Sequence, residues 1–104
     1  MKNIPYGKQD ITQHDLDAVC EVLNSDFLTQ GPAIEKFEKE LAEYSGSKFS
    51  ISVNSATSAL HIACLALGVG KGDIVWTSPI TFVASANCAL YCGATIDFVD
   101  IDPL

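Results

Sequence analysis

Residues 54–90, NSATSALHIACLALGVGKGDIVWTSPITFVASANCAL, decide the fold. Small polar residues open a helix predicted over residues 56–67, which is apolar on nearly every face and is therefore expected to be buried on both sides. A second polar junction at residues 77–82 opens another apolar helix over residues 81–91. A helix start presents unpaired N–H groups and the positive end of a dipole. Each junction is therefore a natural seat for a phosphate group.

Between the two helices, residues 68–73 read GVGKGD. A phosphate-binding glycine loop follows a strand and opens a helix, whereas this one follows a helix and precedes a strand. We therefore interpret it as a helix stop and turn. Strands are predicted over residues 48–53, 74–77 and 95–99. The order strand, helix, strand, helix, strand predicts an α/β fold with a parallel βαβαβ sheet, in which ligands bind at the carboxyl ends of the strands.

The first 46 residues precede this sheet and are predicted to form an N-terminal helical arm. Thr12, with Asp15 three residues later, predicts a capping box for a helix ending near Asn24. Gly31-Pro32 predicts a second helix start, and Gly46 its end. We expect residues 1–46 to form the arm, and residues 47–104 to form the first part of an incomplete large domain.

The amino-acid composition of the chain excludes some classes of function. The chain has 104 residues, is 48% hydrophobic and carries a net charge of -7, with six lysines and no arginine. This excess of acidic residues and the absence of arginine argue against a nucleic-acid-binding surface, which needs clusters of basic residues. Neither a signal peptide nor an apolar run long enough to span a membrane is present in the sequence. The four cysteines lack a closely paired motif, which predicts buried free thiols in a reducing cytoplasm.

Several residues admit two interpretations. The junction at residues 54–57 is typical of an ordinary helix cap, or of a phosphate site that uses backbone N–H groups and the hydroxyls of Ser55 and Thr57. Phe82 is typical of a core aromatic, or of one that stacks on a planar ligand. His61, the only ionisable group on its apolar helix, is predicted to be a hydrogen-bonded structural histidine.

Taken together, four segments resemble one family. They are LTQGP at residues 28–32 with Phe37-Glu38, NSATSAL at 54–60, SPITFVASAN at 78–87 and DFVDID at 97–102. The chain resembles the N-terminal part of the pyridoxal-phosphate-dependent sugar-nucleotide aminotransferases, of the aspartate-aminotransferase-like fold. The opening IPYG at residues 4–7 and LNS at 23–25 are most similar to the branch that serves pseudaminic acid biosynthesis. That branch aminates C4 of a UDP-linked 4-keto-6-deoxy-N-acetyl-hexosamine, with glutamate as donor.

The resemblance implies a role for each matched position. Ala56 and Thr57 would hold the cofactor phosphate, and Phe82 would stack on the pyridine ring. Contacts to the nucleotide sugar would come from Tyr6, Asp26, Phe27, Leu28, Thr29 and Ala56. Phe27 and Leu28 would equally serve as a hydrophobic anchor onto the core. The resemblance also implies a cytoplasmic homodimer with its active site at the subunit interface.

The resemblance places the family's Schiff-base lysine further downstream. Lys71 lies in a predicted turn, and Lys36 and Lys39 lie on a solvated helix face, so none of the lysines here matches it. Without such a lysine the cofactor chemistry cannot be delivered. The chain alone is therefore expected to be inactive, and to be either a fragment or a truncated product.

Three alternatives remain open. Asp100-Ile101-Asp102 after a strand is similar to the Asp-x-Asp of metal-dependent glycosyltransferases, where carboxylates hold a divalent cation. Cys88 and Cys92, four residues apart on a helix, could form a metal site with His61. The chain could also be a non-catalytic binding or dimerisation module, because exposed apolar helix faces favour association.

Overall fold

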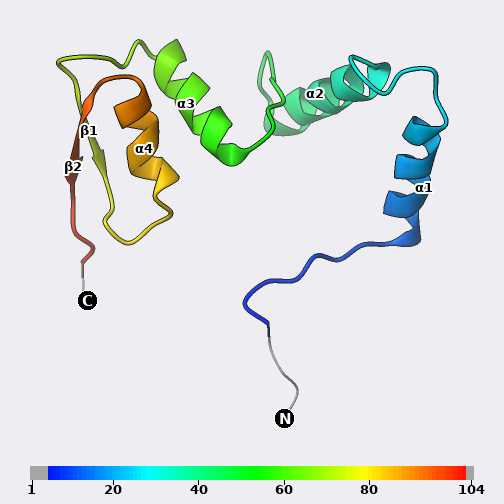
Figure 1. Ribbon diagram of the computed structural model, residues 1–104, viewed down its shortest axis with the longest axis horizontal. Coiled ribbons are helices and arrows are strands. Elements are labelled where there is room, and N and C mark those ends of the chain that lie inside the picture. Colours follow the sequence, from blue (N-terminus) through cyan, green and yellow to red (C-terminus); the bar gives the residue numbers. More distant parts are fainter. Residues whose placement is uncertain (1–4, 103–104) are drawn as a thin grey trace. The chain divides into compact units, whose positions relative to one another are not determined.

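The computed structural model describes residues 5–102. They form two compact units, divided between Ser50 and Ile51. The first unit contains helices α1 (Gln13–Leu23) and α2 (Pro32–Ser45). The second contains helix α3 (Ala56–Ala66), strand β1 (Ile74–Thr77), helix α4 (Ala84–Tyr91) and strand β2 (Thr95–Phe98) (Figure 1).

The predicted starts of both arm helices are confirmed, and so is the predicted end of the second. The Thr12 backbone N–H donates to Asp15 Oδ2 at 2.7 Å, and the Thr12 hydroxyl donates to the same oxygen at 2.8 Å. These bonds to the charged form lower the pKa of Asp15 below its ordinary value. Pro32 occupies the first turn of α2, and Gly46 ends the helix with a φ of 68°, a left-handed conformation that glycine adopts without steric cost.

The second unit is built around one βαβ crossover. Strands β1 and β2 pair in parallel, with Ile74 opposite Thr95 at one end and Thr77 opposite Phe98 at the other. Helix α4 packs against both strands and against α3. The buried side chains are small and lie on α4 or directly after it: Ala84, Ala86, Cys88, Ala89 and Ala94.

The edge at which the strands end is also where both helices begin. In Figure 1, α3 and α4 run against the direction of β1 and β2. The turn after α3 is the predicted helix stop, in which the Gly70 N–H donates to Asp73 Oδ2 at 2.8 Å. The α/β class and the parallel pairing are therefore confirmed, and both helix starts lie at the carboxyl edge of the sheet.

Three local predictions are wrong. Residues 48–53 form no strand, and the sheet among the described residues has two strands instead of three. Helix α3 buries none of its residues, although its apolar faces predict cover on both sides. Helix α4 begins at Ala84, three residues later than predicted. The first two errors share a cause, because a strand and an apolar helix face both need a neighbouring element that the described residues do not supply.

Candidate functional site

The start of α3 is the better formed of the two predicted helix junctions. Ser55 adopts an extended backbone, and its Oγ accepts a hydrogen bond from the Ser58 backbone N–H at 3.2 Å. Ser58 Oγ in turn donates to Asn54 Oδ1 at 2.7 Å. The Ser55 hydroxyl thus caps the helix, which is one of the two interpretations that the sequence left open for this junction.

The cap leaves a defined set of donors open. The helical bonds begin with the Ala59 N–H, which donates to the Ser55 carbonyl at 3.1 Å. Within residues 5–102, no acceptor forms a hydrogen bond with the backbone N–H groups of Ala56 and Thr57 or with the Thr57 hydroxyl. Three donors are therefore available in the first turn of α3, at the positive end of the helix dipole, and such a donor set suits an oxyanion.

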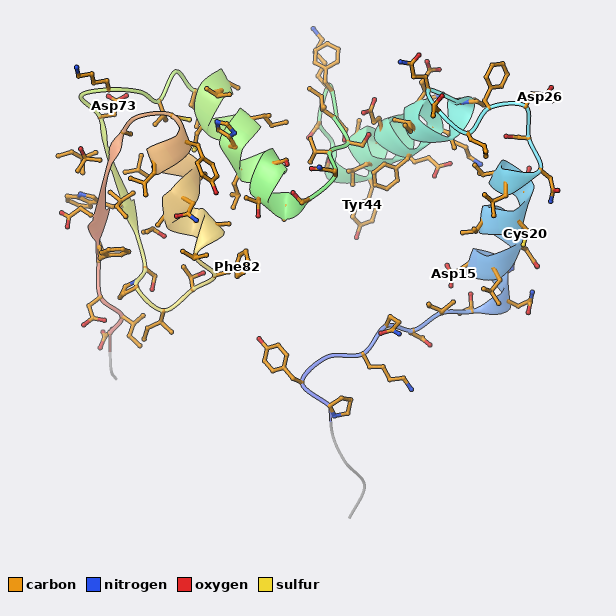
Figure 2. The ribbon with its side chains drawn as sticks, in the orientation of Figure 1. Asp15, Cys20, Asp26, Tyr44, Asp73 and Phe82 are labelled. Carbon is orange, nitrogen blue, oxygen red and sulfur yellow. The ribbon has the colours of Figure 1, made fainter. Side chains whose placement is uncertain are left out.

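Phe82 lies at the same edge of the sheet, where the chain enters α4 (Figure 2). Its side chain is 73% exposed, so it is not a core residue within the described chain. The Phe82 carbonyl accepts from the Ser85 N–H at 3.0 Å, which fixes the backbone directly before the helix. No side chain caps α4. The second junction therefore exposes the aromatic ring of Phe82 and does not form a second capped anion-binding site.

In the first unit, a loop between α1 and α2 carries four of the predicted sugar-binding residues: Asp26, Phe27, Leu28 and Thr29. Ser25 holds the loop, since its Oγ donates to the Val22 carbonyl at 2.7 Å. The Phe27 and Leu28 side chains are 59% and 66% exposed, so neither anchors a core among the described residues.

Gly31, predicted from the sequence as part of a helix start, also shapes this loop. A Cβ atom at Gly31 would lie 2.9 Å from Phe27 Cβ and 3.0 Å from the Phe27 carbonyl oxygen. The loop can therefore close only around a residue without a side chain. Gln30, directly before it, has a φ of 55°. The glycine next to a proline was visible in the sequence, but the close approach to Phe27 was not.

Tyr6 lies before α1 with its side chain fully exposed. Tyr6 and the loop belong to the first unit, whereas Ala56, Thr57 and Phe82 belong to the second. The structure thus brings together the residues predicted to bind the cofactor at one sheet edge, and it groups four of the sugar-binding residues in one loop.

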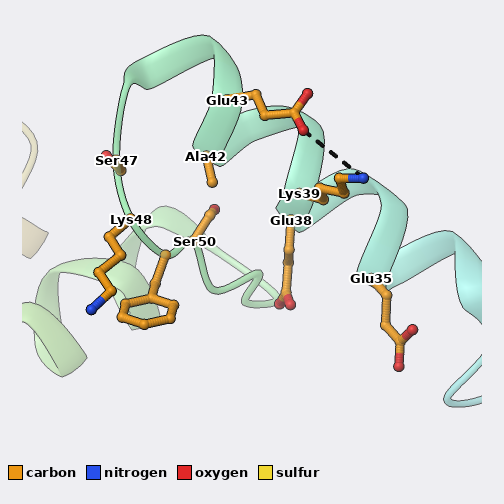
Figure 3. Close-up of a pocket in the computed structure, with 9 residues that line it drawn as sticks. Glu35, Glu38, Lys39, Ala42, Glu43, Ser47, Lys48 and Ser50 are labelled. Carbon is orange, nitrogen blue, oxygen red and sulfur yellow. Dashed lines mark ion pairs between the residues drawn. The ribbon is translucent and has the colours of Figure 1, made fainter.

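Two hollows lie within the first unit. One, of about 430 Å³, is lined by three glutamates, Lys39 and Ala42 of α2 and by residues 47–50 after it. Lys39 and Glu43 form an ion pair at 4.0 Å within this lining (Figure 3). Its three glutamates make it a poor phosphate site. The other, of about 470 Å³, includes Phe27 among residues of α1 and α2.

The metal alternatives find no support in residues 5–102, where no three His, Cys, Asp or Glu side chains are grouped to hold an ion. The Asp100 carboxylate accepts from the Ile101 N–H at 2.8 Å. The His61 ring instead meets Tyr91 edge-on, with centroids 5.3 Å apart. All four cysteines are free as predicted, but only Cys88 is buried: Cys64 and Cys92 are partly exposed, and Cys20 is exposed. No helix in this described region is long and apolar enough to cross a membrane.

Comparison with known proteins identifies relatives along nearly the whole chain. Residues 9–104 match the DegT/DnrJ/EryC1/StrS aminotransferase family. A UDP-4-amino-4,6-dideoxy-N-acetyl-beta-L-altrosamine transaminase from Campylobacter jejuni is 49% identical over 98 residues, which cover 94% of this chain and 26% of that protein. The chain therefore spans about a quarter of the length of this relative.

Solved structures agree with the sequence match. Helicobacter pylori PseC, described as an aminotransferase involved in the biosynthesis of pseudoaminic acid, superposes with a TM-score of 0.88 at 40% identity. That match covers 97% of this chain and 28% of PseC. The sugar aminotransferase Spr1654 from Streptococcus pneumoniae, in its PLP form, gives a TM-score of 0.88 at 36% identity, covering 96% of this chain and 26% of its own.

Proposed function

Because the chain belongs to the DegT/DnrJ/EryC1/StrS aminotransferase family, we propose that the protein carrying it transfers an amino group to a nucleotide-linked sugar with pyridoxal 5'-phosphate as cofactor. The substrate would be a UDP-linked 4-keto-6-deoxy sugar, aminated at C4, with glutamate as the amino donor. Similarity to the altrosamine transaminase supports this substrate class.

One observation carries the cofactor proposal. The start of α3 offers the Ala56 and Thr57 N–H groups and the Thr57 hydroxyl, three donors with no acceptor within residues 5–102. A phosphate ester needs this donor set, and the helix dipole adds to its attraction. The residues present therefore fit the phosphate end of the cofactor.

The aromatic ring of the cofactor would lie against Phe82. Bound pyridoxal phosphate supplies the electron sink that amino transfer requires. The exposed Phe82 side chain would orient the ring by stacking and would keep water from one of its faces. Ala56 and Thr57 would fix the position of the phosphate, so that these three residues set the place and plane of the cofactor.

The loop of the first unit would receive the nucleotide sugar. We assign its contacts to exposed residues of the arm and to the start of α3: Tyr6, Asp26, Phe27, Leu28, Thr29 and Ala56. Exposed rings such as Phe27 suit the face of a uracil base or a sugar. Asp26 can accept hydrogen bonds from sugar hydroxyls.

The 104-residue chain would not carry out this reaction alone. Lys36 and Lys39 are paired with Glu40 and Glu43 on the exposed face of α2, at 3.9 and 4.0 Å. Lys71 lies in the exposed turn before β1. Within the second unit, Lys71 lies before β1, at the end of the sheet opposite the carboxyl edge where Thr57 and Phe82 are found, so we infer that it would not bind the cofactor covalently.

We also propose that the intact protein is a homodimer. The apolar stripes of α1 and α2 remain 41–62% exposed, at Leu16, Val19, Leu23, Ile34, Phe37 and Leu41. Two amphipathic helices with open apolar stripes need a partner surface. Light scattering on the intact protein tests this, and a monomer at micromolar concentration contradicts it.

The cofactor site is tested by removing one donor. Thr57→Val keeps the shape of the side chain but removes its hydroxyl, and a hydrogen bond to a charged group contributes about 1.5–3 kcal/mol. Pyridoxal phosphate binding to the intact protein, followed by fluorescence, should weaken roughly 10- to 100-fold. Thr95→Val, at the exposed opposite end of β2, is the matched control and should leave binding unchanged.

Two further experiments test the proposed amino transfer and the expected inactivity of the 104-residue chain. The intact protein should convert a UDP-4-keto-6-deoxy sugar to its amino sugar with glutamate, as measured by mass spectrometry. The 104-residue chain, treated with pyridoxal phosphate and borohydride, should carry no pyridoxyl group on any lysine. A stoichiometric adduct on Lys36, Lys39 or Lys71 would contradict the proposed division of the site.

A further inference from the structure

The loop between α1 and α2 is tied to the end of α1 through Ser25. The Ser25 hydroxyl shares its one proton between the carbonyl oxygens of Val22, at 2.7 Å, and Phe27, at 3.1 Å. The Phe27 backbone N–H donates to the same hydroxyl oxygen at 3.4 Å. One side chain therefore connects the last turn of α1 to both backbone groups of Phe27.

Gly31 limits the position of Phe27 from the other end of the loop. Gln30 has a φ of 55°, a left-handed conformation that reverses the chain directly before Gly31. A Cβ atom at Gly31 would lie 2.9 Å from Phe27 Cβ and 3.0 Å from the Phe27 carbonyl oxygen, closer than ordinary van der Waals contact. The absence of a side chain at Gly31 is therefore what lets the chain pass so close to Phe27.

These two restraints act on a loop whose apolar side chains are largely exposed. The Phe27 side chain is 59% exposed and that of Leu28 is 66% exposed, so burial contributes little to holding them. A loop that is free to move loses conformational entropy when it binds a ligand, which weakens binding. Contacts that fix the Phe27 backbone before a ligand arrives reduce this loss.

We propose that Ser25 and Gly31 are positioning residues, which hold the Phe27 ring in place to receive the nucleotide sugar. The proposal rests on the proposed sugar-binding function of this loop, and it adds two residues that the assigned sugar contacts do not include. Neither residue needs to touch the ligand, because both act through Phe27. The loop therefore has its binding shape before the sugar is bound.

Ser45 offers a matched comparison within the same unit. Its hydroxyl donates to the Leu41 carbonyl at 2.8 Å, so that it too bonds a carbonyl near the end of a helix. Ser45 is the last residue of α2, whereas the loop precedes the first. Removing either hydroxyl should lower stability by a similar amount, but only the loss of the Ser25 hydroxyl should weaken sugar binding.

Binding of UDP-N-acetylglucosamine to the intact protein, measured by calorimetry, tests the positioning function. This UDP sugar has no keto group, so binding is measured without turnover. Ser25→Ala should raise its Kd about 3- to 10-fold, as expected for the loss of a hydrogen bond that holds the loop. Ser25→Thr keeps the hydroxyl and should restore the wild-type Kd. Ser45→Ala should leave Kd unchanged, while thermal unfolding shows a similar decrease in Tm for both alanine variants.

Two further readouts separate positioning from a general loss of structure. Ser25→Ala should leave pyridoxal phosphate affinity unchanged, because the proposed cofactor residues belong to the second unit. In a Phe27→Ala background, Ser25→Ala should have no further effect on the Kd of the UDP sugar, because the ring that it positions is gone. Gly31→Ala should weaken UDP-sugar binding in the same direction as Ser25→Ala.

The outcomes distinguish this proposal from the proposed function. Weaker binding in Phe27→Ala beside wild-type binding in Ser25→Ala would refute the positioning function alone. The same holds for wild-type binding in Phe27→Ala, or for an equal effect of Ser25→Ala with and without the Phe27 ring. If the wild-type protein binds no UDP sugar, the proposed function fails, and the positioning function fails with it.

Discussion

Replacing Ser55 by aspartate separates the two properties of the α3 start. Asp caps a helix about as well as Ser, so the bond from the Ser58 N–H, 3.2 Å long in the structure, should be retained. The substitution also places a negative charge beside the open N–H groups of Ala56 and Thr57. Helix stability should therefore be kept while anion binding is lost.

The size of the effect follows from the charges. Two unit charges about 4 Å apart interact with roughly 1 kcal/mol in water. A phosphate ester carries between one and two charges at neutral pH, so binding should lose roughly 1–2 kcal/mol, or about 5- to 30-fold in Kd. The loss should shrink as salt is raised, because the Debye length falls to about 8 Å at physiological ionic strength and about 3 Å at 1 M.

The Ser55→Ala variant tests the cap without a change of charge. It removes the cap and costs about 1 kcal/mol of helix stability, but adds no charge. The Ala59 N–H, which donates to the Ser55 carbonyl at 3.1 Å, should then exchange about fivefold faster. Pyridoxal phosphate titrations at low and high salt, with amide exchange on the same variants of the intact protein, check both properties. If Ser55→Asp binds pyridoxal phosphate as tightly as the wild type at low salt, the anion does not sit at this helix start.

Three other substitutions are predicted to have measurable effects. Gly31→Ala should cost about 1–3 kcal/mol of stability and displace the Phe27 ring, because its Cβ would lie 2.9 Å from Phe27 Cβ, and thermal unfolding should show no such loss in the open control Gly7→Ala. Asp15→Asn should remove an acid-sensitive part of α1 stability: the lowered pKa means that the wild-type contribution is complete above about pH 4 and is lost as pH falls through the lowered pKa, and helicity measured against pH should show this loss in the wild type alone. Phe82→Ala should weaken pyridoxal phosphate binding roughly 2- to 10-fold, whereas Phe82→Tyr should keep it, and equal affinities would show that the ring does not stack there.

Features that depend on neighbouring residues in the sequence were predictable. The Thr12–Asp15 capping box, Pro32 and Gly46 at the ends of α2, and the glycine turn before β1 all follow the sequence pattern. Each of these is completed by residues within a few positions of one another, so no distant element is needed to form it. Strand β1 was also predicted over its whole length, although its pairing with the more distant β2 is not a local feature.

Features that depend on distant elements were not predictable in this way. Residues 48–53 alternate like a strand, but a strand forms only against a partner, and the structure pairs only β1 with β2 in the described region. The closeness of Gly31 to Phe27 depends on how the loop turns back. For the candidate site, the sequence located the donors at Ala56 and Thr57, but it did not show that the Ser55 hydroxyl is already used by the cap. Their assignment to a cofactor stays a prediction.

Helix α3 carries the proposed phosphate site, so what holds this helix in place also affects cofactor binding. It buries none of its residues, so its position cannot rest on a core of its own. Its start is held by the Ser55 cap, and a later turn is held by the contact of the His61 ring with the Tyr91 ring of α4. A phosphate seat made of backbone N–H groups works only while the first turn keeps its direction, because those donors belong to the helix itself. The contact with α4 therefore supports the proposed phosphate site from a later turn of the same helix.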